Sequence, residues 1–260
     1  MSDTPDSLPS KPVNRRTDRS RPSIFWLLAS LVLPLARVMM KITIVDAHKL
    51  PKTGPFILAP NHFSEIDPIV IGIATWKIGR FPRFMAKASL FRIPIVGRLL
   101  RASGQIPVER EGSLRGKGPI EAAGDLVTTG SGVIVYPEGT LTRDPEMWPM
   151  RGKTGAARMA LTHGLPVIPV AHWGTQHVMA RYAKKVSFFP PKKITIKVGD
   201  VVDLSELDGH APDSAALTRA TSLIMDAITR ELEDIRHEKA PTERWDPTKH
   251  NQKETGRFES

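Results

Sequence analysis

The chain has 260 residues, 40% of them hydrophobic and 25% charged, which suits one large domain or two small ones with a sizeable core. This composition excludes collagen-like, low-complexity and wholly disordered proteins, and the absence of cysteine excludes a disulfide scaffold, a zinc ribbon, an iron–sulfur cluster and a cysteine nucleophile. The formal net charge of +10 predicts an anionic partner: nucleic acid, anionic lipid, a phosphorylated substrate or an acidic carrier protein.

The N-terminal part of the sequence divides into a polar arm and an apolar segment. Residues 1–21 contain no hydrophobic cluster and carry five basic and three acidic residues, so we expect a disordered basic arm. An apolar run follows over residues 24–40, but it is shorter than the roughly 20 residues that span a bilayer. Pro34 and Arg37 interrupt the run, and it lacks the small-residue cleavage site of a signal peptide.

The apolar segment over residues 22–40 has two interpretations. Phe25 and Trp26 near its start, beside Arg21, favour a membrane-associating helical segment in the bilayer interface. A buried core helix is the alternative. On the first interpretation the basic arm favours the cytoplasmic side, so we expect a peripheral or monotopic protein at the cytoplasmic face of the cell membrane.

Strand and helix patterns alternate over residues 41–238. Strands are expected, in chain order, at 41–46, 55–59, 104–108, 132–136, 166–171 and 193–198. Helices are expected at 68–75, 119–129, 152–163 and 214–235, the last capped by Asp213 or Ser214. Strands separated by helices predict an α/β domain with a mostly parallel sheet flanked by helices. The polar residues 239–260 are expected to form a tail.

The motif NHFSEID at residues 61–67 lies between an apolar strand and a helical segment. On one continuous helix, residues five apart point about 140° from each other, so His62 is expected in the loop before the first turn, with Asp67 reaching back. The carboxylate would accept a hydrogen bond from one ring nitrogen and leave the other as a base, as acyl transfer requires. A helix N-cap beside an incidental histidine is the alternative.

Three further motifs lie on the expected strands or at their ends. YPEGT at 136–140 follows a buried strand, at the end where open α/β sheets bind ligands, although these residue types also form turns. GQIPVER at 104–110 ends in Arg110, whose planar guanidinium suits either a phosphate or a surface ion pair. VIPV at 167–170 indicates only packing by itself.

The four motifs together, in this order and spacing, resemble the glycerolipid acyltransferase family, which includes 1-acylglycerol-3-phosphate acyltransferases. The family pattern is NHxxxxD, a G-x-I-x-V-x-R-like strand, P-E-G-T and V-x-P-V, and here it covers roughly residues 40–200. The resemblance implies an acyltransferase domain over 41–238 behind an N-terminal membrane-associating segment. It also implies acyl transfer from an acyl-CoA or acyl-carrier-protein thioester to the sn-2 hydroxyl of 1-acylglycerol-3-phosphate, giving phosphatidic acid.

The resemblance also assigns roles to individual residues. It implies that His62 is the general base and Asp67 orients it. The candidates for binding the phosphate and glycerol parts of the substrate are Arg110, Glu138, Gly139, Thr140, Arg143 and Lys153. The sequence departs from the usual E-G-T-R, because Leu141 and Thr142 precede Arg143. Lys153, at the start of the following helix, is therefore a further candidate for the phosphate.

Other ligand-binding signals are weak. Residues 152–154 (GKT) lack the other glycines of a P-loop, and His172 and His177 lack a zinc-binding spacing. We therefore expect no metal and no cofactor, with the acyl-CoA or acyl-carrier protein as a co-substrate.

Basic and aromatic residues are interleaved over residues 76–101 and again over 181–193. Such clusters can bind single-stranded nucleic acid or an anionic bilayer. Since a lysophospholipid lies in the bilayer, the acyltransferase motifs favour an anionic membrane surface, with no nucleic acid. Two alternatives remain, namely the same chemistry on another acceptor and a non-catalytic basic domain that binds membranes or nucleic acid.

Overall fold

The structure is a computed structural model that describes residues 24–108, 124, 126–207 and 212–253. Five of the described strands form one sheet in the order β1-β7-β6-β2-β5. They are β1 (Met40–Val45), β2 (Phe56–Pro60), β5 (Gly132–Ile134), β6 (Val167–Trp173) and β7 (Lys192–Val198). Neighbouring strands run parallel except β6 and β7, which are antiparallel. The prediction of a mostly parallel α/β sheet is therefore confirmed.

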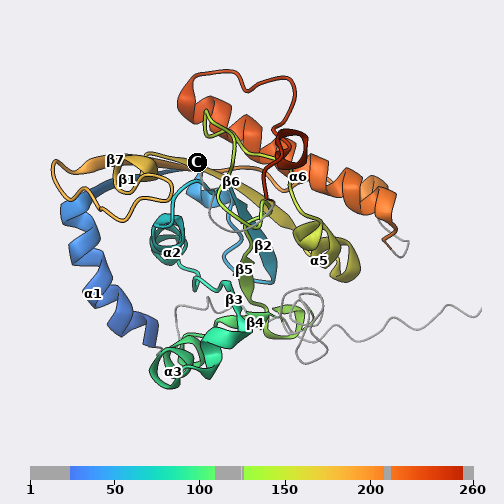
Figure 1. The fold of residues 1–260 in the computed structure, drawn as a ribbon. Helices are drawn as coiled ribbons and strands as arrows, with labels where there is room; N and C mark the ends of the chain where they lie inside the picture. The colour runs from blue at the N-terminus through green and yellow to red at the C-terminus, as the bar shows by residue number, and fades with distance from the viewer. Residues whose placement is uncertain (1–23, 109–123, 125, 208–211, 254–260) are drawn as a thin grey trace, which may run out of the picture.

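Helices cover both faces of this sheet. They are α1 (Ile24–Met39), α2 (Asp67–Ile78), α3 (Pro94–Ala102), α5 (Gly155–His163) and α6 (Ser214–Arg236). Short 3-10 turns are η2 (Ala47–Lys49), η3 (Ala88–Arg92), η4 (Thr175–His177), η5 (Ser205–Leu207) and η6 (Pro247–His250). Helices α1 and α2 pack on one face of the sheet, and α5 and α6 pack on the other (Figure 1).

Strand β2 lies inside the sheet, between β5 and β6, and all its residues are buried. Phe56 and Leu58 belong to the core on the α1–α2 side, whereas Ile57 and Ala59 belong to the core on the α5–α6 side. Because successive side chains of a strand point to opposite faces, one short apolar run supplies both cores. Its carboxyl end at Pro60 is thereby fixed, and residues 61–67 start from this fixed point.

Helix α1 packs along one side and leaves the other exposed. The Phe25 ring stacks on Phe81, with ring centroids 5.0 Å apart, and Met39 is buried in the core. The exposed large side chains recur at helical spacing: Leu27, Leu31, Leu35 and Val38. In the described part of the chain, no helix combines the length and the apolar character needed to cross a membrane. Membrane association of this segment stays a prediction.

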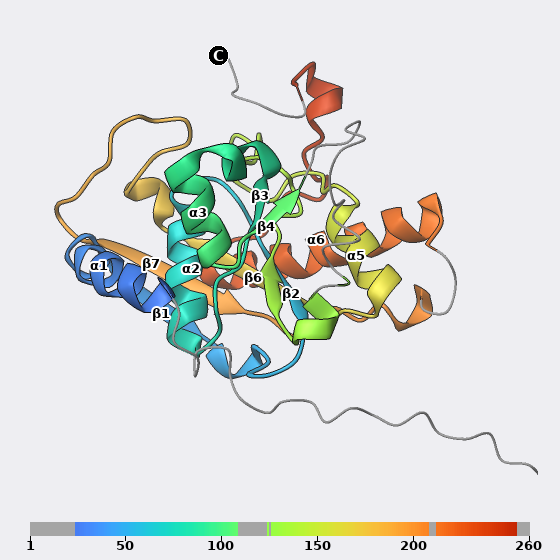
Figure 2. The same ribbon diagram turned by 90° about the horizontal axis from the view of Figure 1, so that it is seen from below.

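Most expected elements are present. The six expected strands are β1, β2, β4 (Ile106–Val108), β5, β6 and β7, and three expected helices are α2, α5 and α6. Asp213, one of the two caps predicted for α6, accepts a hydrogen bond from Ala216 N at 2.7 Å. Neither α3 nor β3 (Met85–Lys87) was predicted, and β3 pairs with β4 (Figure 2). The arm 1–21 and most of the helix expected at 119–129 lie outside the described residues.

Residues 239–253 lie on the domain, whereas their composition predicted a tail. Ala240 N donates to Glu233 Oε1 at 2.9 Å, and Arg151 N donates to Trp245 O at 2.9 Å. The Trp245 and His250 rings stack with centroids 3.6 Å apart. A polar segment can dock in this way through hydrogen bonds, and its sequence then shows no hydrophobic periodicity.

Candidate active site

The turn that carries the candidate base continues directly from strand β2. The side chain of Asn61 pairs with the backbone of His172 at the end of β6. Its Nδ2 donates to His172 O at 3.1 Å, and its Oδ1 accepts from His172 N at 2.9 Å. The buried side-chain amide of Asn61 thus extends the pairing between β2 and β6 beyond Pro60. It fixes the point at which the chain leaves the sheet.

Asp67 organises the turn as the first residue of α2. Its Oδ2 accepts hydrogen bonds from Phe63 N and Ser64 N, both at 2.8 Å, and lies 3.0 Å from His62 Nδ1. The aspartate is fully buried, and one oxygen therefore both closes the turn and contacts the imidazole. His62 lies before the first turn and Asp67 reaches back to it, which is the arrangement that their spacing predicts.

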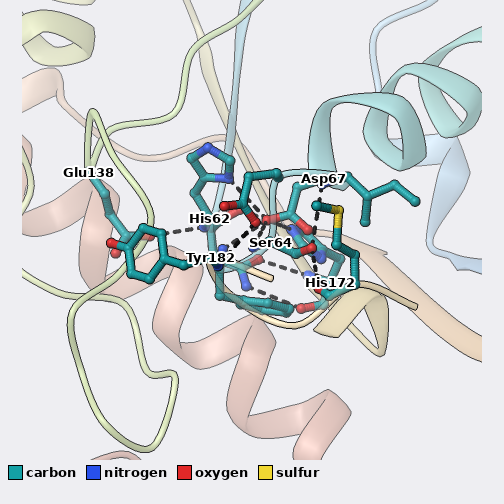
Figure 3. Close-up of polar contacts among 11 residues, drawn as sticks. His62, Ser64, Asp67, Glu138, His172 and Tyr182 are labelled. Carbon is teal, nitrogen blue, oxygen red and sulfur yellow. Dashed lines mark hydrogen bonds and ion pairs between the residues drawn. The ribbon is translucent and has the colours of Figure 1, made fainter. Parts of the chain in front are cut away.

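Asp67 is ionised in this environment. Burial alone would raise the pKa of its carboxyl group, but the His172 and His62 side chains outweigh that effect and hold the pKa below its ordinary value. Because a carboxylate can only accept, His62 carries its proton on Nδ1 and keeps a lone pair on Nε2. The His62 ring stacks on Tyr136 with centroids 4.1 Å apart, and 16% of its side chain is exposed. The second nitrogen points away from Asp67 (Figure 3).

A second imidazole, His172, lies beneath Asp67. Its Nε2 donates to Asn61 O at 2.9 Å and is 3.7 Å from Asp67 Oδ2. The ring is fully buried, and burial lowers the pKa of His172 and favours its neutral form. Its N–H dipole therefore favours the charged state of Asp67 without placing a second positive charge there. Sequence analysis noted His172 only for its lack of zinc spacing, although its place at the end of a strand beside β2 was a usable signal.

Glu138 approaches His62 from the side opposite Asp67 (Figure 3). The Glu138 side chain is buried, and its Oε1 accepts from His62 N at 3.0 Å while its Oε2 accepts from Met150 N at 3.0 Å. Burial raises the pKa of Glu138 to about 8, against the opposing effect of these two N–H groups. Both oxygens are thus bonded to the chain itself. Glu138 thus supports the turn of residues 61–67 that carries His62, called the base turn below, and its contact with phosphate or glycerol stays a prediction.

Three other candidate residues gather on the loop after β5. Gly139 has a φ of +69°, and a Cβ there would come within 3.0 Å of Lys153 Cδ. The Lys153 stem therefore passes over the glycine, and the backbone N of Lys153 donates to Pro137 O at 2.8 Å. Gly139 and Lys153 are exposed and Thr140 is half-buried beside them. The charge of the exposed Lys153 side chain beside this glycine suits an anionic group of a substrate.

Arg143 is buried. The residue before it, Thr142, is bonded to the turn that carries His62. Thr142 N donates to His62 O at 2.6 Å. Arg181, which sequence analysis did not select for the site, donates through Nη1 to Thr142 O at 2.6 Å and to Asp144 O at 2.8 Å. Its partners are 39 and 37 residues away in sequence, so no local pattern marks the contact. Arg110 lies outside the described residues.

An apolar cavity of about 450 Å³ lies along helix α2. Pro68 and Ile69, which directly follow Asp67, line one part of it. Side chains from α1 and α3 and their neighbours line the rest, among them Leu28, Val32, Phe84, Leu99 and Leu100. The site therefore combines a polar turn with an adjoining apolar space. Within the described residues, no three His, Asp or Glu side chains are grouped as ligands for a metal ion.

Known proteins share this sequence pattern and fold. A family model described as Acyltransferase matches residues 41–173. The chain is 28% identical to the 1-acyl-sn-glycerol-3-phosphate acyltransferase of Borreliella burgdorferi over 83% of this chain and 81% of that protein. It is 26% identical to the Bacillus subtilis protein of the same name, over 74% and 88%.

The chloroplastic 1-acyl-sn-glycerol-3-phosphate acyltransferase of Brassica napus is 29% identical to this chain. The match covers 54% of this chain and 39% of the Brassica protein. Among solved structures, the 1-acyl-sn-glycerophosphate acyltransferase of Thermotoga maritima has a TM-score of 0.57 at 22% identity, covering 85% of this chain and 86% of that one. This structural likeness supports the fold. The family match covers the motif of the base turn, the PEGT loop and strand β6, and on this basis the chain belongs to the acyltransferase family.

Proposed function

We propose that the protein transfers a fatty acyl group from a thioester, of coenzyme A or of an acyl-carrier protein, to the sn-2 hydroxyl of 1-acylglycerol-3-phosphate. The product is phosphatidic acid, an intermediate of phospholipid synthesis. The observation that carries this proposal is the bonded pair of His62 and a buried, ionised Asp67 in a chain of the acyltransferase family. The names of the relatives supply the acceptor.

His62 would act as the general base through Nε2. It removes the proton from the acceptor hydroxyl as the hydroxyl oxygen attacks the thioester carbonyl carbon. The C–O bond forms, the C–S bond breaks, and the imidazolium returns the proton to the leaving thiolate. Asp67 holds the ring in the required tautomer and stabilises the imidazolium, since it accepts from Nδ1 at 3.0 Å. No covalent acyl-enzyme is needed.

The phosphate of the acceptor would bind at the loop that follows β5. Lys153 supplies a positive charge beside Gly139 and Thr140. Arg110 and Arg143 stay proposals for the same group. Glu138 would act indirectly, because its carboxyl group accepts a hydrogen bond from the backbone of His62.

The apolar cavity along α2 would take a fatty acyl chain. Its lining begins at Pro68 and Ile69, so a chain in the cavity has its carbonyl end near the Asp67 end of the helix. Ligand sites of this kind are mostly apolar with few polar groups, as here. The exposed stripe of α1 would rest on the membrane, which we propose to be the cytoplasmic face of the cell membrane.

An acyl-transfer assay in detergent micelles tests the proposal. Purified protein receives acyl-CoA or acyl-carrier protein with 1-acylglycerol-3-phosphate, and thiol release and the lipid product are followed together. Wild type and His177→Ala, a change at an exposed histidine on η4, should form phosphatidic acid, whereas His62→Ala should not. A panel with glycerol 3-phosphate and other lysophospholipids tests the acceptor. No product with either donor and any acceptor would contradict the proposed function.

A further inference from the structure

The loop between η4 and β7 exposes two adjacent aromatic rings. Phe188 is 56% exposed and Phe189 is 83% exposed. Among the large hydrophobic side chains that the structure describes, only Ile95 is as exposed as Phe189. Single exposed apolar residues are ordinary, but two neighbouring aromatics at a loop tip indicate a surface that contacts an apolar partner.

The same loop is strongly basic. Lys184, Lys185 and Lys193, which flank the two rings in sequence, are exposed, and Lys192 is half-buried. No acidic residue occurs in the sequence from 181 to 199. Exposed apolar rings flanked in sequence by lysines match an anionic bilayer, where apolar groups enter the acyl region and ammonium groups meet the headgroups.

The loop tip and the end of α1 lie at the same end of the sheet, where strands β1 and β7 begin. Strand β7 pairs with β1 so that Lys192 is opposite Met40. The residues that precede each of them, the loop tip and the last turn of α1, are therefore neighbours, and both views show the loop beside this end of α1 (Figures 1 and 2). Val38 on that turn is exposed. The exposed stripe of α1 therefore ends close to the loop.

The other end of the loop is bonded to the candidate active site. Ser64 Oγ donates to Met179 O at 2.6 Å, and Tyr182 N donates to Glu65 Oε2 at 3.3 Å. Residues 64 and 65 belong to the turn that carries His62. The first part of the loop is therefore held directly against the turn that carries the base.

We propose that residues 183–191, with the flanking lysines 192 and 193, form a second membrane-docking element. Phe188 and Phe189 insert among the lipids of an anionic bilayer, and the lysines contact its headgroups. The element acts beside α1 and sets the orientation of the His62 turn toward the membrane. This proposal rests on the proposed function, which places the acceptor in the bilayer.

The absence of cysteine makes a direct test possible. Phe189→Cys in the full chain creates a single thiol for an environment-sensitive fluorophore. The matched control is Val201→Cys, at an exposed apolar position beyond the opposite end of β7. On adding vesicles of phosphatidylglycerol and phosphatidylcholine, the label at 189 should shift its emission to the blue, and the label at 201 should not. Pure phosphatidylcholine should give a smaller shift.

Three outcomes would overturn the docking element. They are an unchanged emission at 189 with or without vesicle binding, an equal shift at 201, and a shift that requires acyl-carrier protein instead of vesicles. These readings do not depend on catalysis, so they separate this proposal from the proposed function.

A charge variant tests the basic rim of the loop. Lys184→Glu with Lys185→Glu should weaken partitioning onto the anionic vesicles by about tenfold or more, because each basic residue contributes near an anionic surface. As a control, the double change Asp203→Lys with Glu206→Lys, at exposed positions after β7, is added to the lysine variant to restore its net charge. This combined variant should not recover the lost binding. Unchanged partitioning of the lysine variant would contradict a headgroup contact by this loop.

Discussion

The N-terminal end of helix α2 and its side toward α1 and α3 have different surroundings. At its N-terminal end, Asp67 bonds two backbone N–H groups and the imidazole of His62 with one buried oxygen. Along its side toward α1 and α3, a cavity of about 450 Å³ is lined mostly by apolar side chains. The first region is fixed by directional hydrogen bonds, and the second is bounded by non-directional apolar contacts.

This difference matches what the two parts of an acyl transfer need. Proton removal requires a base within hydrogen-bond reach of one hydroxyl, so the turn must hold His62 to within a fraction of an ångström. An acyl chain has no polar group to orient, so its site requires only volume and an apolar lining. Mutations should therefore have large effects on the rate at the turn and graded effects on substrate choice at the cavity.

The largest effect is expected for Asp67→Asn. The amide oxygen could keep the three contacts of Oδ2, but it carries no negative charge to stabilise the imidazolium that forms at His62, and its NH2 group would be buried in place of an oxygen that has no hydrogen-bond partner. We expect kcat to fall on the order of 10³-fold. Steady-state kinetics in micelles measures this, with circular dichroism to show a folded chain. A folded variant within tenfold of wild type would show that Asp67 does not orient the base.

A smaller loss is expected for Glu138→Ala. The change leaves the N–H groups of His62 and Met150 buried without acceptors, at about 1–3 kcal/mol each. The base turn then shifts, and kcat should fall about 10²-fold. Urea unfolding and kinetics should move together. A variant that loses substrate affinity alone, with stability unchanged, would favour a direct contact between Glu138 and the substrate.

The stability of the protein should depend on pH through the same two carboxyl groups, with opposite signs. Native Glu138 has a pKa raised to about 8 from 4.5, so its contribution to stability is lost as the pH rises through that range. Asp67 has a lowered pKa, so its contribution is present at neutral pH and lost as the pH falls below its ordinary range. Urea midpoints from pH 5 to 8 should fall in wild type and flatten in Glu138→Gln. Equal slopes would contradict the assignment.

The apolar side can be tested by filling the cavity at Gly72. An added Cβ there would make ordinary contacts with Pro82 and Phe84, so the helix can accept a larger side chain. Gly72→Leu should lower kcat/KM for long acyl chains about tenfold relative to short ones, and Gly72→Ala should have a smaller effect in the same direction. A uniform loss across chain lengths would place the acyl chain elsewhere.

The smallest effect on stability is expected at the exposed stripe of α1. Leu31→Ser should change the free energy of unfolding by no more than about 0.5 kcal/mol, since the side chain is exposed. It should still reduce binding to anionic vesicles severalfold, because an apolar group leaves the docking surface. Vesicle sedimentation beside urea unfolding measures both. A large loss of stability would instead place Leu31 in a protein core.

Much of this architecture is predictable because periodicity is a local property. The buried strands are short apolar runs, and the spacing of His62 and Asp67 alone requires one to precede the helix and the other to reach back. Helix α3 was not predicted because its basic residues and large apolar residues resemble a surface cluster, and its apolar side faces the cavity and the outside.

The contacts that support the base are long-range, and no local pattern contains them. His172 reaches Asn61 across 111 residues, and Glu138 reaches His62 across 76. The family motif marks Glu138 as important, but it does not say in which direction the carboxylate points. Only the folded chain shows that both oxygens accept from the backbone.

The most direct test of the account is chemical rescue of the base. His62→Gly removes the imidazole beside Asp67 and Tyr136 and leaves space for a free imidazole. Phosphatidic acid formation by this variant should be on the order of 10³-fold slower than wild type. Added imidazole should restore part of the rate, with saturation. A His62→Gly rate within tenfold of wild type, with no response to imidazole, would contradict His62 as the base.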